Sequence, residues 1–195
     1  MEQLQAREHP IRLVNDDDLR RSRVTVFFRL LLAVPHFLWL ALWSMAALLA
    51  ALAGWVVALF RGRVPDPIHA FLARYTRYFT HVYAYYHLLS EPFPRFGGAR
   101  GYPVDLDVDP AEAQSRLTVL LRWLLAIPAF LLAYVFRVLM SVLAFVGWFY
   151  ALATGRMSDG IEGLGNYALR YEAQTVAYAL LVTDRYPSLG GGPTA

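Results

Sequence analysis

The sequence predicts an all-α membrane protein made of two tandem, pseudo-symmetric repeats. Each repeat is expected to contain a short strand, a long proline-kinked transmembrane helix and a second helix that is amphipathic or transmembrane. Hydrophobic residues make up 57% of the 195 residues and charged residues only 17%, a ratio that needs lipid or a partner. Apolar residues run from Leu30 to Phe60 with His36 as the single titratable group, which is longer than a globular core helix tolerates.

Composition also excludes several classes of chemistry. The chain contains no cysteine, so disulfides, thiolate nucleophiles and sulfur-ligated metals are absent. Its net charge of +3 comes from arginine without lysine, and the arginines flank apolar segments, which argues against nucleic-acid binding. The start of the chain is acidic, with Glu2, Glu8 and Asp16–Asp18, so we expect no cleaved secretion signal.

A duplication organises the chain. When His9 is aligned with Tyr102, an offset of 93 residues (102 − 9), the second half repeats the first without a gap. The matched pairs include glycines, prolines, aspartates and arginines, which composition alone would not align: Pro10 and Pro103, Pro35 and Pro128, Gly54 and Gly147, Gly62 and Gly155, Asp66 and Asp159, Arg77 and Arg170, Gly97 and Gly190. We therefore divide the chain into an N-terminal tail (1–8), repeat 1 (9–98), a linker (99–101), repeat 2 (102–191) and a C-terminal tail (192–195).

Each repeat opens with an alternating stretch, PIRLV or PVDLDVDP, that is typical of a strand. A lone strand would leave its backbone groups to water, so we expect the two strands to pair with each other. Arg12 occupies the position matched by Asp105, and pairing would bring these opposite charges close.

A long apolar segment follows each strand. Pro35 and Pro128 should kink it early on. The favoured spans are Phe37 to Phe60 and Phe130 to Ala153, which are long enough to cross a hydrocarbon core of about 30 Å with some tilt.

The second helices are expected over Ile68 to Leu89 and Ile161 to Val182. Arg77 and Arg170 lie near their centres, where a guanidinium in a crossing helix cannot easily reach a headgroup. We expect both to be buried polar anchors, in helices that lie either in the membrane plane or inside a bundle. Pro/Gly-rich stretches, EPFPRFGG and DRYPSLGG, close the repeats and cannot be helical.

Three motif pairs carry a resemblance to a known family: RLLLAVPHF with RWLLAIPAF, GWVVALFRGR with GWFYALATGR, and SEPFPRFGG with TDRYPSLGG. With these motifs the chain resembles the bacterial domain-of-unknown-function family 4389, once over 9–98 and again over 102–191. The resemblance implies a small membrane protein and assigns no catalytic residues. The second copy departs from the pattern at Arg137, where the first has Ser44.

Three arginines in the long segments are candidate lipid-headgroup contacts or structural anchors. Arg29 and Arg122 recur at the start of both segments, where the guanidinium would either snorkel to phosphate or form a dedicated headgroup site. Arg137 lies deep in an apolar helix and needs to snorkel, to pair with Glu162 or Glu172, or to line a polar path.

No metal, cofactor or catalytic site is expected. Asp105, Asp107 and Asp109 alternate, but the position that would be a glutamate in a calcium loop is Arg116. The five histidines, at positions 9, 36, 69, 81 and 87, show no metal-binding spacing. No Ser/His/Asp arrangement or phosphate loop is present.

The leading hypothesis is therefore a non-enzymatic membrane protein, either a scaffold or accessory subunit or a lipid-contacting component. Its partners would be the lipid bilayer and a membrane protein or a second copy of itself. The alternative is a small transporter or channel with its pathway at the repeat interface or in an oligomer, and a membrane-embedded enzyme comes third. Arginines concentrate before the first span and in the linker, so we expect a multi-pass protein of the cell inner membrane with N-terminus, linker and C-terminus cytoplasmic and the repeats parallel.

Overall fold

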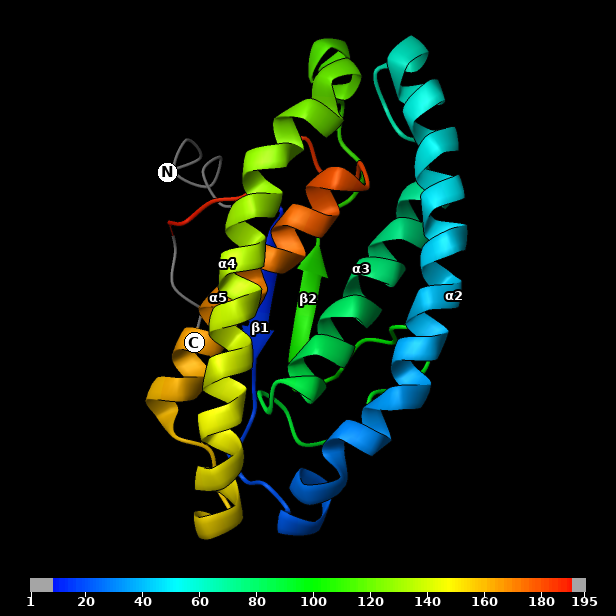
Figure 1. Cartoon of the computed structure of the whole chain (residues 1–195). Coiled ribbons are helices and arrows are strands. Elements are labelled where there is room, and N and C mark those ends of the chain that lie inside the picture. Colours follow the sequence, from blue (N-terminus) through cyan, green and yellow to red (C-terminus); the bar gives the residue numbers. More distant parts are fainter. Residues whose placement is uncertain (1–8, 191–195) are drawn as a thin grey trace, which may run out of the picture.

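The computed structural model describes residues 9–190, and this part of the chain is mostly helical. In chain order the elements are β1 (Ile11–Asn15), α2 (Arg23–Arg61), α3 (Asp66–Tyr86), β2 (Val104–Val108), α4 (Arg116–Thr154) and α5 (Asp159–Ala179). Figure 1 shows α2 and α4 as the two longest elements. The two tandem halves therefore have the same content, as the sequence predicts: one strand, one long helix and one shorter helix.

The long helices contain the expected spans and also the stretch before each of them. Each helix has 39 residues and continues through its proline, Pro35 or Pro128, so Phe37–Phe60 and Phe130–Ala153 lie within longer helices. A proline within a helix removes one hydrogen bond and bends the axis without having to end it. Each helix stops at a glycine, Gly62 or Gly155, whose φ of 70° or 75° is left-handed and suits a residue without a Cβ.

The two strands form an antiparallel pair, which confirms the predicted pairing. Leu13 lies opposite Leu106, its own counterpart at the repeat offset, and Ile11 lies opposite Val108. Because a residue faces its own repeat counterpart, a pseudo-two-fold axis relates the two repeats. This axis passes through the Leu13–Leu106 pair, perpendicular to the sheet. The expected charge partner of Arg12 is wrong: Arg12 lies opposite Asp107 and bonds Asp109, with its Nη2 at 2.9 Å from Oδ1.

The same axis makes α2 and α4 antiparallel to each other. The expectation of parallel repeats concerns an axis along the membrane normal, and it stays a prediction. The backbone before α2 pairs with the turn after α4, Arg20 with Arg156, and the backbone before α4 pairs with the turn after α2, Arg63 with Ala113. Two indole N–H groups also link each long helix to the start of the other. Trp148 donates to the Val26 carbonyl at 3.0 Å, and Trp55 to the Val119 carbonyl at 2.8 Å. Each long helix therefore holds the other at both ends.

The elements stack in three layers. The helices α2 and α4 form the first layer, α3 and α5 the second, and the sheet the third, since each strand contacts only the other strand and one short helix. In Figure 1, α2 and α4 stand at the two sides, with the short helices and the sheet between and behind them. Leu72, Tyr78, Val82, Leu106 and Leu169 lie at the centre of the core and are fully or almost fully buried.

The short helices are buried on most of their surface. They run from Asp66 to Tyr86 and from Asp159 to Ala179, ending about three residues before the predicted limits. Each begins with an aspartate in its first turn, and this negative charge interacts favourably with the positive end of the helix dipole. Their polar residues near the centre therefore lie inside the protein and not on a lipid-facing side.

The segment that closes repeat 1 packs closely against α3, and this packing depends on Gly98. Its φ is 64°, and a Cβ there would lie 2.5 Å from the carbonyl oxygen of Arg74 in α3. Gly97 also has a positive φ, of 100°, but no atom would lie within 4 Å of its Cβ. A side chain at either glycine would strain the backbone, but only at Gly98 would it also overlap a neighbouring helix. Comparing the two positions therefore isolates the effect of the overlap.

We predict that Gly98→Ala lowers the free energy of unfolding by about 1–3 kcal/mol more than Gly97→Ala does, because only the former drives a methyl group into a helix backbone. The measurement is denaturant or thermal unfolding of both variants in detergent. Equal losses would show that α3 and the segment that closes repeat 1 do not meet as described.

Candidate functional site between the long helices

Arg29 and Arg122 are the most deeply buried charged groups of the first layer, at 2% and 0% exposure. Arg29 Nη1 donates to the carbonyls of Tyr85 and Ser90 at 2.7 and 2.8 Å, and Nη2 bonds Glu91. Arg122 makes the same contacts one repeat later, to Tyr178, Thr183 and Asp184. Each guanidinium also lies over a tyrosine ring, at 4.4 or 4.5 Å.

These contacts place both arginines at the C-terminal ends of α3 and α5. Carbonyl groups there have no partner within the helix, and the helix dipole favours a cation. Both guanidinium groups are buried and donate to protein acceptors. The geometry is that of a structural anchor.

The acidic partners of these anchors were missed in the sequence. Glu91 and Asp184 are counterparts at the repeat offset, and both are acidic although the residue type differs. Matching by charge instead of identity would have found them. A second side chain donates to a carbonyl just after the end of each short helix, and its type differs between the repeats. Arg21 donates to the Leu88 carbonyl, whereas its counterpart Gln114 donates to the Leu181 carbonyl.

Arg77 and Arg170 are also buried, at 8% and 7% exposure, on the side of α3 and α5 that faces away from the long helices. Arg77 Nε donates to the Leu106 carbonyl of β2 at 3.0 Å and lies 3.4 Å from Asp105. Arg170 donates to the Gly190 carbonyl at 2.9 Å. Glu172, two residues further along α5, bonds Arg137 and not Arg170.

Asp105 lies between Arg77 and His81, and the Oδ1 atom of Asp105 is 2.8 Å from Nε2 of His81. Burial would raise the pKa of Asp105, but hydrogen bonds from His81 and from the backbone of Gly101 and Leu106 hold this pKa below its usual value. Asp109 is engaged by Arg12. The three alternating aspartates therefore do not converge, and residues 9–190 hold no group of side chains arranged to bind a metal ion.

Arg137 lies at the middle of α4 and pairs with Glu172 of α5. Its Nε donates to Glu172 Oε1 at 2.7 Å, and Nη2 bonds the same oxygen. The Arg137 side chain remains 45% exposed, whereas Glu172 is 1% exposed and its Oε2 has no hydrogen-bond partner among the described residues. The ring of Tyr83 lies 5.4 Å from the guanidinium. Of the readings considered for Arg137, the structure places it in the ion pair.

Two adjoining hollows lie along α4, and Arg137 lines one of them. One, of about 460 Å³, is lined by Tyr134, Arg137, Val138, Ser141, Val142 and Phe145. The other, of about 390 Å³, also contains Ser141 and Phe145 and reaches Arg29, Leu30, Tyr86 and Leu88. Both fall in the size range of small-molecule sites, which are mostly apolar with a few polar groups. We call the two together the central groove.

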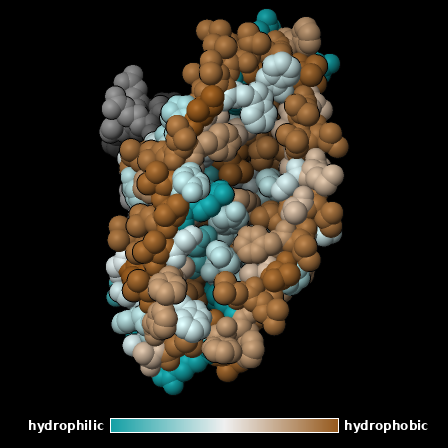
Figure 2. All heavy atoms as spheres, viewed as in Figure 1, coloured by the Kyte–Doolittle hydropathy of each residue, from teal (hydrophilic) through white to brown (hydrophobic). Residues whose placement is uncertain are grey.

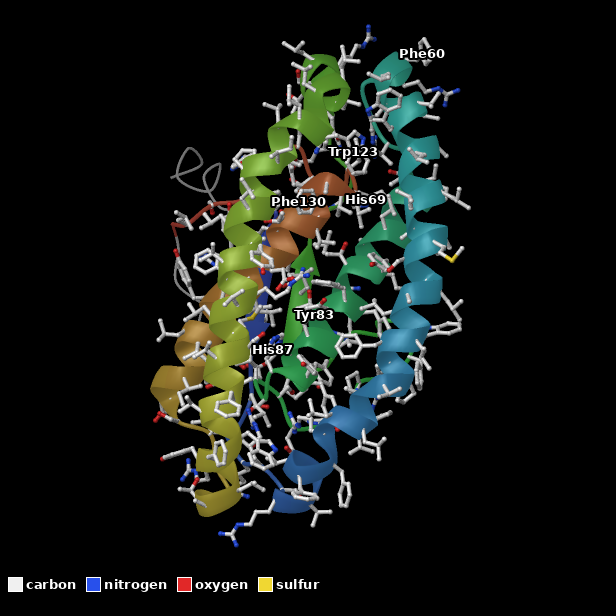
Figure 3. The ribbon with its side chains drawn as sticks, in the orientation of Figure 1. Phe60, His69, Tyr83, His87, Trp123 and Phe130 are labelled. Carbon is white, nitrogen blue, oxygen red and sulfur yellow. The ribbon has the colours of Figure 1, made fainter. Side chains whose placement is uncertain are left out.

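The pictures place the central groove between the long helices. Figure 2 shows hydrophobic residues over most of the two long helices, with hydrophilic residues in the furrow between them. Tyr83 and His87, labelled in Figure 3, lie between α2 and α4. His87 Nδ1 is 2.9 Å from the Tyr83 carbonyl, and burial lowers the pKa of His87 to about 4. Of the five candidate arginines, only Arg29 and Arg137 reach the central groove.

Comparison with known proteins identifies the repeat unit. The model of a family described as a domain of unknown function, DUF4389, matches residues 23–97 and again residues 116–189. A search of curated proteins and a search of solved structures found no match.

We predict that Arg137→Leu and Glu172→Leu each destabilise the protein and that the double variant recovers much of the loss. Either single change leaves one charge of the pair without its partner, whereas the double change removes both. Thermal unfolding in detergent should give a coupling of about 0.5–3 kcal/mol.

Arg61→Leu is the control for this cycle, because Arg61 is exposed at the end of α2, and we expect a change within about 0.5 kcal/mol. Additive losses in the double variant would contradict the ion pair.

Proposed function

The chain belongs to the DUF4389 family, of which it carries two copies, and we propose that it is a non-enzymatic membrane protein that holds a lipid in the central groove. Two helices, Arg23–Arg61 and Arg116–Thr154, are long and apolar enough to cross a membrane. We place the protein in the cell inner membrane, with N-terminus, linker and C-terminus on the cytoplasmic side, where it would act as a scaffold or accessory component.

The observation that carries the proposal is the half-exposed side chain of Arg137, which is paired with buried Glu172 and lines an apolar groove. A charge at the middle of an apolar helix costs roughly 2.5–3.5 kcal/mol on insertion scales, so Arg137 needs partners for all of its donors. Glu172 engages Nε and Nη2, which leaves the outer edge of the guanidinium facing the hollow that Arg137 lines. The polar group of an amphiphile would meet that edge, while its chain would lie along Val138, Val142 and Phe145.

The other polar side chains support a binding role over catalysis. Arg29, Arg122 and Arg77 are occupied in joining helix ends and strands. They lie in three different places, so they do not assemble a reaction centre. Arg137 is the member of the predicted set with a large exposed fraction, and its surroundings are apolar.

We predict that the protein purifies with about one bound lipid per chain and that Ser141→Trp abolishes this retention. Ser141 lines both hollows, so an indole there would fill the central groove. The measurement is native mass spectrometry of protein extracted from native membranes in mild detergent.

Leu48→Trp provides the matched control. Leu48 is the counterpart of Ser141 at the repeat offset and is 49% exposed on α2, but it lines neither hollow. We expect this variant to retain the lipid. Loss in both variants, or retention in both, would contradict binding in the central groove.

A transporter is the second candidate, because the pseudo-two-fold axis puts the central groove at the interface of the repeats, where duplicated transporters bind substrate. In that case vesicles containing the protein would show solute flux, and Ser141→Trp would block it while Leu48→Trp would not. Bound lipid without flux favours the lipid-contacting protein.

A further inference from the structure

The first layer exposes an unusually large apolar surface. Along α2 only a stripe is buried, at Val26, Arg29, Ala33, His36 and Leu40 and onward at the same spacing of three and four residues. The remaining surface is exposed and almost wholly apolar, and α4 repeats the pattern. Residues exposed by more than 60% on the two helices include Leu31, Leu38, Leu49, Phe60, Leu124, Leu131 and Phe145. A surface of this extent marks a membrane or protein contact.

These helices are too long to stand upright in a bilayer. At about 1.5 Å per residue, 39 residues extend over about 58 Å, roughly twice the hydrocarbon thickness of about 30 Å. To keep both ends at the two surfaces, such a helix would lean by about 60°, whereas membrane helices lean by about 0–40°.

The face of the molecule opposite the long helices is polar, and it lies level with the middle of those helices. Because the pseudo-two-fold axis passes through the Leu13–Leu106 pair and relates α2 to α4, the sheet lies level with the middle of the long helices. Arg74, Arg95, Arg100 and Asp107 are exposed in α3, the linker region and β2. In an upright molecule these charges and the outer edges of both strands would meet the hydrocarbon core, where open sheet edges do not occur.

We propose that the molecule lies within one leaflet, with the pseudo-two-fold axis along the membrane normal, α2 and α4 immersed, and the sheet facing water. A layer one helix thick measures about 10 Å, which fits the half-thickness of about 15 Å implied by a core of about 30 Å. The inference rests on the membrane location proposed above. It keeps the N-terminal, linker and C-terminal segments on one side without any crossing.

Charge at the rim of the first layer complements the lipid. Arg23 and Arg61 at the ends of α2, and Arg116 and Arg156 at or just beyond the ends of α4, are all exposed. Their apolar stems can follow the helices while the guanidinium groups reach lipid phosphate. The occupant of the apolar face is therefore a phospholipid leaflet, which supplies both the chains and the surrounding anions.

Single-cysteine labelling tests the orientation, since the chain has no cysteine of its own. Asp66 and Asp159 are repeat counterparts, exposed at the first residues of α3 and α5, and lie at opposite ends of the molecule. In sealed vesicles of one orientation, a membrane-impermeant maleimide should label Asp66→Cys and Asp159→Cys from the same side. Asp107→Cys on the sheet should react from that side too, and Leu49→Cys should react only after detergent is added.

The outcomes are distinguishable. Labelling of the two aspartate positions from opposite sides would overturn the single-leaflet orientation and leave the membrane location intact. Release of the protein by high salt and alkaline carbonate, as a soluble dimer or otherwise, would overturn the membrane location itself. Because all four positions are exposed, the melting temperature of each variant in detergent should stay within a few degrees of the parent protein.

Discussion

The structure depends on how two guanidinium groups satisfy the ends of two buried helices. The last carbonyls of α3 and α5 lie inside the protein, where an unpaired group costs about 1–3 kcal/mol. Arg29 and Arg122 each donate to one carbonyl of the last helical turn, that of Tyr85 or Tyr178, and to one carbonyl of the segment that follows, that of Ser90 or Thr183. Each also bonds a carboxylate. A cation is favourable there because the helix dipole ends in partial negative charge. The anchors lie near the starts of α2 and α4, so they fix the antiparallel packing of each long helix against its short one.

This arrangement turns polar residues inward and apolar residues outward. The short helices use their arginines, threonines and histidines in internal bonds. Each long helix packs against them along a narrow stripe only, so the rest of its apolar surface stays exposed. Duplication then brings the two apolar helices together on one face and the two strands together on the other. Near the middle of this apolar face lies the charged side chain of Arg137, whose counterpart in the first repeat is Ser44. The pseudo-symmetry is broken there, at a half-exposed arginine that lines a hollow, and this is where the proposed ligand site lies.

The sequence predicted the duplication, the element types and the strand pairing, because each leaves a local or periodic signal. Matched glycines and prolines fixed the offset, and alternation marked Ile11–Asn15 and Val104–Val108. Long-range choices left no such signal. The antiparallel course of α2 and α4 depends on contacts such as Trp148 with the Val26 carbonyl, which a charge count cannot detect. Glu172 bonds Arg137 instead of the nearby Arg170 because the two side chains lie on different faces of α5. The anchoring roles of Arg29 and Arg122 required knowing which helix end each would meet.

Polarised infrared spectroscopy of the protein in oriented bilayers can show whether the long helices lie in the membrane plane. The amide I transition of an α-helix is polarised close to its axis, and the helices contain most of residues 9–190. We expect a dichroic ratio below that of an isotropic sample, because the mean helix axis should lie closer to the membrane plane than to its normal. A ratio above the isotropic value would mean that α2 and α4 stand upright, which would rule out the single-leaflet orientation.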